Sequence, residues 1–198
     1  MSTKLVDYYF SPSSPWSFLG HARFAQIARR YAAAINVKPV DFGTIFPQSG
    51  GLPLGKRAPQ RQAYRLVELR RWKTFLGVPL NLEPKYFPVD ATRAACIIIA
   101  AEPQGAEAQM RLAEALMRGL WCEENNLADA GQLEAIAGSA GFDAAALLGR
   151  DERAKERYES FTHEALTRGV FGAPTYVYRD ELFWGQDRLD FLERALAM

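Results

Sequence analysis

Residues 4–20 read KLVDYYFSPSSPWSFLG, and this stretch decides the fold class. Its first part, Lys4 to Phe10, is rich in aromatic and β-branched residues and stops at a cluster of serines and prolines, which predicts a strand ending in a loop. Ser14 is a favourable N-cap and Pro15 a favourable first helical residue, because proline lacks the N–H that would have no partner there. The stretch therefore predicts a strand followed directly by a helix.

The next residues continue the alternation of helix and strand. Val37 to Phe42 predicts a second strand, and the helix before it carries an apolar stripe at helical spacing, formed by Trp16, Leu19, Phe24, Ile27 and Ala28. Strand, helix and strand within about 40 residues predict a βαβ unit with parallel strands.

The C-terminal end also predicts sheet structure. Thr175 to Tyr178 and Leu182 to Trp184 flank the short polar segment Arg179-Asp180-Glu181, which is typical of a hairpin. Asp187 then begins a closing helix predicted over Arg188 to Ala197. Both ends of the chain are therefore expected to belong to one α/β unit.

The middle of the chain, from about Pro59 to Arg168, predicts helices alone. Ala91 to Ala101 is apolar nearly all round, so we expect a buried helix there; the other expected helices are an Arg-rich segment to Phe75, Ala108 to Glu124, Asp129 to Ala140 and Asp151 to Arg168. The sequence thus predicts an α/β domain, 1–45 and 169–198, split by an all-helical insertion, 46–168.

Composition limits the classes of function. The chain has 198 residues, 48% of them apolar, and a formal charge of +1, so no overall charge attracts nucleic acid or an anionic membrane. The segment Met1 to Phe10 alternates too quickly for a secretory signal and no stretch could span a bilayer, so we expect a cytoplasmic protein. The two cysteines, Cys96 and Cys122, lie far apart in helical sequence, which supports neither a disulfide framework nor a zinc site.

The first motif that carries chemistry is Ser14-Pro15-Trp16-Ser17 at the strand-to-helix junction. A helix N-terminus offers free N–H groups and a partial positive charge, which stabilise an anion. A redox protein would place Cys-x-x-Cys here; with serine at both positions, any reactive thiol must come from outside the chain. Taken alone, Ser14 is better explained as a simple helix cap.

The second motif, Gly169 to Thr175, reads GVFGAPT and places Pro174 directly before a strand. Proline cannot donate to the sheet ladder, and a proline in this place is often cis. The backbone N–H and C=O of Ala173 would then be free to pair with an extended, peptide-like ligand.

Together with the closing Trp184-Gly185-Gln186-Asp187-Arg188, the two motifs strongly resemble the 2-hydroxychromene-2-carboxylate isomerase family. Its close kin are the kappa-class glutathione transferases, within the thioredoxin-like group that includes the disulfide oxidoreductase DsbA. The resemblance covers essentially the whole chain and implies a thioredoxin-like fold split by the helical insertion, a homodimer, and glutathione as cofactor.

The resemblance also implies roles for individual residues. Ser14 matches the catalytic serine that hydrogen-bonds the glutathione sulfur, and Ala173, before Pro174, matches the position that pairs with the cysteinyl backbone of the tripeptide. Gln186 and Asp187 match the pair that holds the γ-glutamyl end, although Asp187 is also explained as an ordinary charge at a helix N-terminus. One departure is Gly51, which stands where family members commonly have Asn.

The activity that the resemblance implies is glutathione-dependent interconversion of 2-hydroxychromene-2-carboxylate and trans-o-hydroxybenzylidenepyruvate, by addition and elimination of the glutathione thiolate. The expected substrate is a small aromatic 2-keto acid. The alternatives are a kappa-like glutathione transferase, which would consume glutathione, and a non-catalytic module that binds peptides or thiols.

Two weaker features concern the middle of the chain. Lys56, Arg57, Arg61 and Arg65 have the spacing of one helix face and could meet a carboxylate of glutathione or of an aromatic acid, or simply be solvated. Aromatic residues could wall a substrate pocket or form core: Tyr64, Trp72, Phe75, Tyr86 and Phe87. His21 and His163 lack partners at metal-binding spacing, so we assign them neither a catalytic nor a metal-binding role.

Overall fold

The computed structural model describes residues 4–198 of the chain, which form four strands and nine α-helices within that range. In chain order the elements are β1 (Leu5–Phe10), α1 (Pro15–Arg30), β2 (Ala34–Pro39), α2 (Phe42–Ser49), η1 (Leu54–Lys56), α3 (Pro59–Leu76), α4 (Thr92–Ala100), η2 (Glu102–Gln104), α5 (Ala106–Glu123), α6 (Ala130–Ser139), α7 (Ala144–Leu148), α8 (Asp151–Thr167), β3 (Thr175–Tyr178), β4 (Glu181–Trp184), η3 (Gln186–Arg188) and α9 (Leu189–Ala197).

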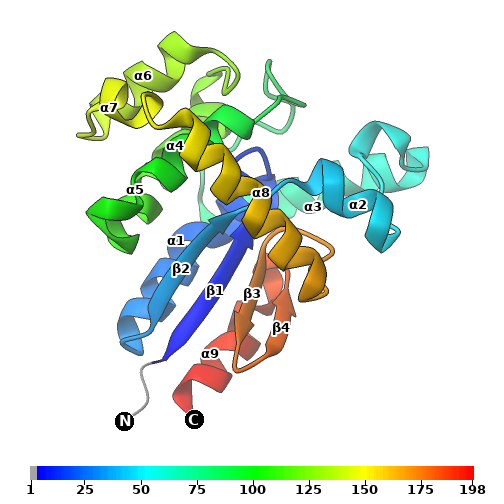
Figure 1. Ribbon diagram of the computed structural model, residues 1–198. Coiled ribbons are helices and arrows are strands. Elements are labelled where there is room, and N and C mark those ends of the chain that lie inside the picture. Colours follow the sequence, from blue (N-terminus) through cyan, green and yellow to red (C-terminus); the bar gives the residue numbers. More distant parts are fainter. Residues whose placement is uncertain (1–3) are drawn as a thin grey trace.

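The four strands form one mixed sheet in the order β2-β1-β3-β4. β1 pairs in parallel with β2 and antiparallel with β3, and β3 pairs antiparallel with β4 (Figure 1). In this register Tyr8 lies opposite Val37 on one side and Tyr176 on the other. The predicted βαβ unit and the predicted C-terminal hairpin are both confirmed.

The end of β2 differs from the prediction, because the strand covers Ala34–Pro39 rather than Val37 to Phe42. Pro39 has no N–H for a further ladder bond, and Asp41 starts a new helix by accepting a hydrogen bond from the Gly43 N–H at 2.7 Å. This helix, α2, was not predicted, nor was the short α7. The domain boundary expected at residue 45 falls inside α2.

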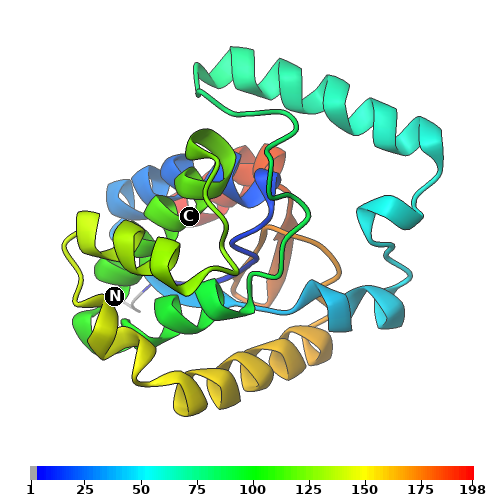
Figure 2. The same cartoon turned by 90° about the horizontal axis from the view of Figure 1, so that it is seen from above.

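Helices cover both faces of the sheet. α1 and α9 lie on one face and α8 crosses the other (Figures 1 and 2). α4, α5 and α8 also contact β2, so the helical segment between β2 and β3 packs onto the sheet. This arrangement confirms the predicted fold class, an α/β fold interrupted by a large helical insertion.

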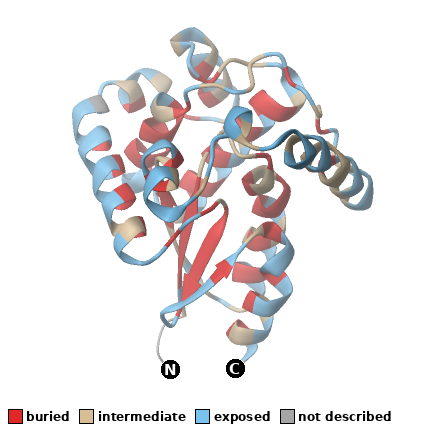
Figure 3. Cartoon of the chain, turned by 90° about the vertical axis from the view of Figure 1, so that its right-hand side faces the viewer, coloured by how far each residue is buried: buried red, intermediate tan, exposed pale blue. Residues whose placement is uncertain are grey.

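The core is centred on aromatic side chains of the middle strands. Tyr8 is fully buried, and its ring stacks on Phe10 and Tyr176 at centroid distances of 4.5 and 5.3 Å. Buried residues are concentrated in the strands and in the helix sides that face them (Figure 3). The expected buried helix is confirmed, because every residue of α4 from Ala94 to Ala100 is buried.

Helix α3 lies at the periphery of the molecule, where it contacts α1 (Figure 2). Leu69 is its one buried residue, whereas Tyr64 and Phe75 are 58% and 77% exposed. These two rings therefore neither form core nor line an enclosed pocket. Among residues 4–198, no helix combines the length and the apolar character that a bilayer crossing requires.

Candidate functional site

Ser14 is the N-cap of α1, as the sequence predicted. Its backbone is extended, at φ −83° and ψ 122°, and its Oγ accepts a hydrogen bond from the Ser17 N–H at 3.2 Å. Because a hydroxyl group has one hydrogen and two lone pairs, Ser14 can still donate a hydrogen bond. The Trp16 N–H has no acceptor among the described residues, so a free backbone donor lies beside that hydroxyl.

The second motif meets Ser14 at the same cavity, which encloses about 550 Å³. Phe171, Gly172 and Ala173 line this cavity together with Ser14, and the Ala173–Pro174 peptide is cis, as expected. The loop is held in place because the Pro174 carbonyl accepts from the Gly185 N–H at 2.8 Å. Within residues 4–198 the backbone N–H and C=O of Ala173 have no hydrogen-bond partner, so both can pair with a ligand.

Gln186 and Asp187 lie outside the lining of this cavity. Gln186 is 2% exposed, and its side-chain and backbone oxygens both accept hydrogen bonds from the Arg23 guanidinium, at 2.9 and 2.6 Å. The Asp187 carboxylate is paired with Arg188 at 2.6 Å and remains half-exposed. In this structure Asp187 can therefore still exchange partners, whereas the Gln186 side chain is already engaged.

The cavity is positively charged and lined with aromatic rings. Arg57, Arg61 and Arg65 line it, and the described lining residues include no Asp or Glu. Lys56 does not line it, and neither Lys56 nor Arg57 lies on α3, so the expectation of one four-residue helix face was wrong. Six aromatic rings complete the walls: Trp16, Phe42, Phe46, Phe87, Phe171 and Trp184.

Of the aromatic wall expected from the sequence, Phe87 alone lines the cavity. The other rings come from elements that meet only in the fold: Phe42 and Phe46 from α2, Phe171 from the loop before β3, and Trp184 from β4. Phe42 and Phe46 have the i, i+4 spacing of one helix face, which could have indicated them. Their helix was missed because the strand was expected to continue to residue 42.

The loop that contains Gly51, where family members commonly have Asn, also lines the cavity. A Cβ built on Gly51 would lie 2.4 Å from Cδ1 of Phe46, far inside van der Waals contact. A larger residue could fit only if the Phe46 ring or the loop moved. Gly51 thus allows the loop to pack against a cavity ring, and it contributes no side chain to a ligand.

Arg65 has the most restricted environment of the three cavity arginines. Its guanidinium carbon lies 5.0 Å from the ring centroid of Phe87 and 5.9 Å from that of Trp121. Burial, together with a smaller contribution from the nearby charge of Arg57, lowers the pKa of Arg65 to about 10. The group still carries its charge at neutral pH and can attract an anion.

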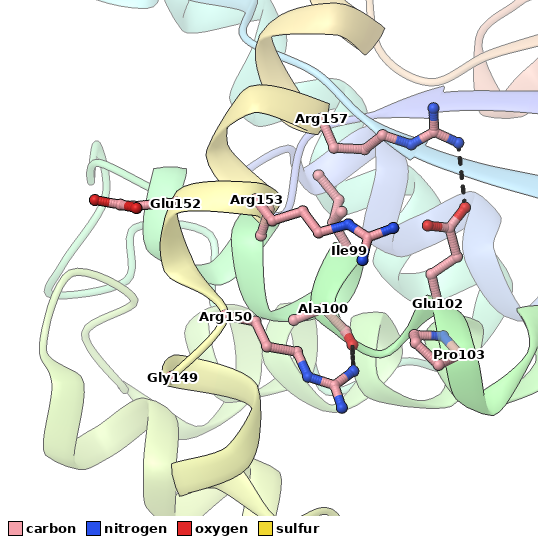
Figure 4. Close-up of a pocket in the computed structure, with 10 residues that line it drawn as sticks. Ile99, Ala100, Glu102, Pro103, Gly149, Arg150, Glu152, Arg153 and Arg157 are labelled. Carbon is pink, nitrogen blue, oxygen red and sulfur yellow. Dashed lines mark hydrogen bonds and ion pairs between the residues drawn. The ribbon is translucent and has the colours of Figure 1, made fainter.

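A larger cavity, of about 1020 Å³, lies between the end of α4, η2 and the start of α8. Figure 4 shows three arginine side chains reaching across it, while Glu152 points away from them. Two of them are already paired, since Arg150 donates to the Ala100 carbonyl and Arg157 to Glu102, both at 3.2 Å. No serine, cysteine, histidine or aromatic residue lines this cavity within the described residues, so the Ser14 cavity is the better candidate for chemistry.

In the described part of the chain, no three His, Cys, Asp or Glu side chains cluster so that they could hold a metal ion. His21 is buried, with its ring nitrogens 3.2 Å from the Tyr8 hydroxyl and 2.9 Å from the Met110 carbonyl. His163 is exposed on α8. Neither histidine lines the Ser14 cavity.

Comparison with known proteins agrees with this geometry. A family model described as DSBA-like thioredoxin domain matches residues 5–197. A relative from Sphingobium xenophagum, named 2-hydroxychromene-2-carboxylate isomerase, is 32% identical over 98% of both chains. A protein of the same name from Pseudomonas putida is 31% identical over 98% of this chain and 94% of its own.

Solved structures give the same result. The structure of a selenomethionine 2-hydroxychromene-2-carboxylate isomerase has a TM-score of 0.84 at 29% identity, covering 98% of this chain and 94% of its own. The cytosolic disulfide reductase DsbM from Pseudomonas aeruginosa, solved with GSH, has a TM-score of 0.67 at 16% identity, covering 98% and 100%. DsbM supports the fold alone. With a family match over nearly its full length and relatives above 30% identity, the chain belongs to the DSBA-like thioredoxin-domain proteins and, among them, to the 2-hydroxychromene-2-carboxylate isomerase family.

Proposed function

We propose that this protein is a glutathione-dependent isomerase that interconverts 2-hydroxychromene-2-carboxylate and trans-o-hydroxybenzylidenepyruvate. The observation that carries the proposal is the placement of the Ser14 hydroxyl at the start of α1, in one cavity with three arginines and the unpaired backbone of Ala173. The names of the relatives at 29–32% identity support the same reaction.

The residues present fit glutathione. The N–H and C=O of Ala173 are free to pair with an extended tripeptide, in the manner of a strand added to a sheet edge. Neither cysteine lines the cavity, so a thiol there must be brought in by a ligand. Bound glutathione would supply a thiolate that adds reversibly to the conjugated keto acid, so that the fixed double bond can rotate.

The protein's own groups would stabilise negative charge. The Ser14 hydroxyl can donate to a sulfur anion, and the Trp16 N–H and the partial positive charge of the α1 N-terminus act in the same direction. Arg57, Arg61 and Arg65 attract the carboxylates of the ligands. The aromatic walls hold a planar ring and exclude water, which strengthens these electrostatic interactions.

The proposal includes the assembly and the location of the enzyme. We propose a homodimer, which light scattering of the purified protein would test against a monomer. We also propose a cytoplasmic enzyme, because the glutathione pool of that compartment is kept reduced and so provides the free thiol.

The test begins with calorimetric titration of the purified protein with glutathione. An ultraviolet assay then follows conversion of the chromene acid with and without glutathione, alongside the Ser14→Ala variant and a Ser139→Ala control. Ser139 is an exposed residue at the end of α6, so its variant should match the wild type. We expect conversion that requires glutathione, leaves its concentration unchanged, and falls by 10²-fold or more in Ser14→Ala, with ~10² taken from the loss of one charge-stabilising donor.

Two results would change the conclusion. Stoichiometric loss of glutathione, with a product that carries it, would identify a kappa-like transferase instead. Conversion unaffected by Ser14→Ala, or the absence of any glutathione-dependent conversion, would favour a module that only binds thiols or peptides.

A further inference from the structure

The three cavity arginines differ in how much of their hydrogen-bonding capacity is used. Arg57 donates from Nε to the Leu52 carbonyl at 2.7 Å, which ties it to the loop before η1. Arg61 is exposed, and its side chain has no hydrogen-bond partner among the described residues. Arg65 is partly buried, and its Nη2 is fully buried without a hydrogen-bond partner. Of the three cavity arginines, Arg65 alone therefore has a buried donor without a hydrogen-bond partner among the described residues.

A second buried donor lies on the ring beside Arg65. Trp121 is 0% exposed, and its indole Nε1 likewise has no acceptor among the described residues. Phe87 packs against Trp121 at a centroid distance of 4.9 Å and also lines the cavity. The Arg65 guanidinium thus lies against two rings, of which Phe87 lines the cavity and Trp121 does not, and the two buried polar atoms left unsatisfied there are both donors.

Buried donors without partners are rare in folded proteins, because each one loses its hydrogen bonds to water without replacement. A water molecule could accept from a neutral donor, but a partly buried guanidinium also lacks a counter-charge. The described cavity lining provides no carboxylate to supply one. Arg65 lines the cavity, and none of its guanidinium nitrogens has a hydrogen-bond partner among the described residues, so a planar, bidentate anion such as a carboxylate can supply both the acceptors and the counter-charge.

We propose that Arg65 binds the carboxylate of the substrate and so makes the cavity selective for aromatic acids over their uncharged analogues. This inference rests on the proposed function, since it takes the second ligand of the cavity to be a small aromatic keto acid. It assigns to Arg65 a role distinct from those of Arg57 and Arg61, which lie in a loop and on the exposed side of α3.

The test uses trans-benzylidenepyruvate, an aromatic keto acid without the ring hydroxyl, and its methyl ester as an uncharged match. Calorimetry measures binding of both compounds to the wild type, Arg65→Gln, Arg65→Lys and Arg70→Gln. Arg70 is an exposed arginine on the same helix and does not line the cavity, so its variant controls for net charge. A parallel titration with glutathione measures the state of the rest of the site.

We expect Arg65→Gln to weaken binding of the acid by about 10- to 100-fold, the effect of one lost charged hydrogen bond, with the ester and glutathione bound as in the wild type. The affinity of Arg65→Lys for the acid should lie between those of the wild type and Arg65→Gln, because lysine keeps the charge but lacks the bidentate guanidinium. Arg70→Gln should keep the full preference for the acid. Should Arg65→Gln fail to fold by circular dichroism, Arg65→Lys decides the matter.

An unchanged preference for the acid in the Arg65 variants overturns the inference, as does an equal loss of acid and ester binding. The proposed function fails separately. If the wild type binds the acid through Arg65 but converts no chromene acid, this inference stands and the proposed isomerase reaction is wrong. If the wild type isomerises the chromene acid and the Arg65 variants keep their preference for the acid, the proposed function stands and this inference is wrong.

Discussion

Lowering the pH below 6.5 is expected to destabilise the protein through one buried imidazole, that of His21. The side chain is 2% exposed. Because the Met110 carbonyl can only accept, Nε2 carries the proton and donates to it, and Nδ1 then accepts from the Tyr8 hydroxyl. Both ring nitrogens are satisfied by a neutral imidazole, and protonation would place an uncompensated charge in the core.

The size of the stability loss follows from the difference between the pKa of His21 in the folded and the unfolded chain. Burial lowers the pKa of His21 from 6.5 to about 4, and the hydrogen bond to Met110 opposes this shift only in part. The unfolded chain therefore binds more protons than the folded chain between pH 6.5 and 4, so stability falls as the pH falls through this window. The expected loss is about 2 kcal/mol at pH 5 and about 3 kcal/mol near pH 4, relative to pH 7.5.

The measurement is urea unfolding from pH 7.5 to pH 4 for the wild type, His21→Gln and His163→Gln. Gln at position 21 removes the titrating group, and the exposed His163 provides the matched control. We expect His21→Gln to lose about 3 kcal/mol less than the wild type across the window, whatever its stability at pH 7.5. Parallel pH profiles for the wild type and His21→Gln would refute this reasoning.

Two further perturbations probe the cavity loop and the buried charges. A Cβ added to Gly172 would lie 2.2 Å from Nε1 of Trp184, so Gly172→Ala should displace the ring or the loop. We expect roughly tenfold weaker glutathione binding in calorimetric titration and a loss of about 1–3 kcal/mol in the free energy of unfolding. Glutathione binding with wild-type affinity would contradict this expectation. Lys38 is 8% exposed and pairs with Asp7 at 2.8 Å, so Lys38→Met should lower the free energy of unfolding in urea by about 3 kcal/mol. Arg30→Met removes an exposed ion pair and should lower it by less than about 1 kcal/mol. Equal losses in the two variants would show that burial does not set the difference.

Local signals predicted the elements that a few neighbouring residues determine. Ser14 and Pro15 fixed the start of α1, because a capping oxygen and a missing N–H act on the first turn of their own helix. The hairpin was predicted from its strand residues and confirmed at β3 and β4. The cis peptide before β3 was also expected, from the place of Pro174 in the sequence.

The walls of the cavity could not be predicted in the same way, because they depend on contacts between distant parts of the chain. Phe171 and Trp184 come from the loop before β3 and from β4, and neither has a local pattern that indicates a shared cavity. The prediction that Arg57, Arg61 and Arg65 supply positive charge was correct, but Arg57 ends η1 and so does not share a helix face with the other two, as its spacing had suggested. The position of Arg65 against Trp121 depends on which side of α3 faces the rest of the protein. The apolar residues of α3 do not gather on one side, so the sequence does not show which side that is.

The most direct test of the proposed function is the pKa of the glutathione thiol when bound to the protein, followed by the ultraviolet absorbance of the thiolate during a pH titration. If the Ser14 hydroxyl and the first turn of α1 stabilise the anion, the bound thiol should titrate at least about one pH unit below free glutathione in the wild type. The Ser14→Ala variant should recover about one unit, the value of one hydrogen bond to a charged group. A bound thiol that titrates like free glutathione in the wild type, or identically in both proteins, would contradict the role assigned to Ser14.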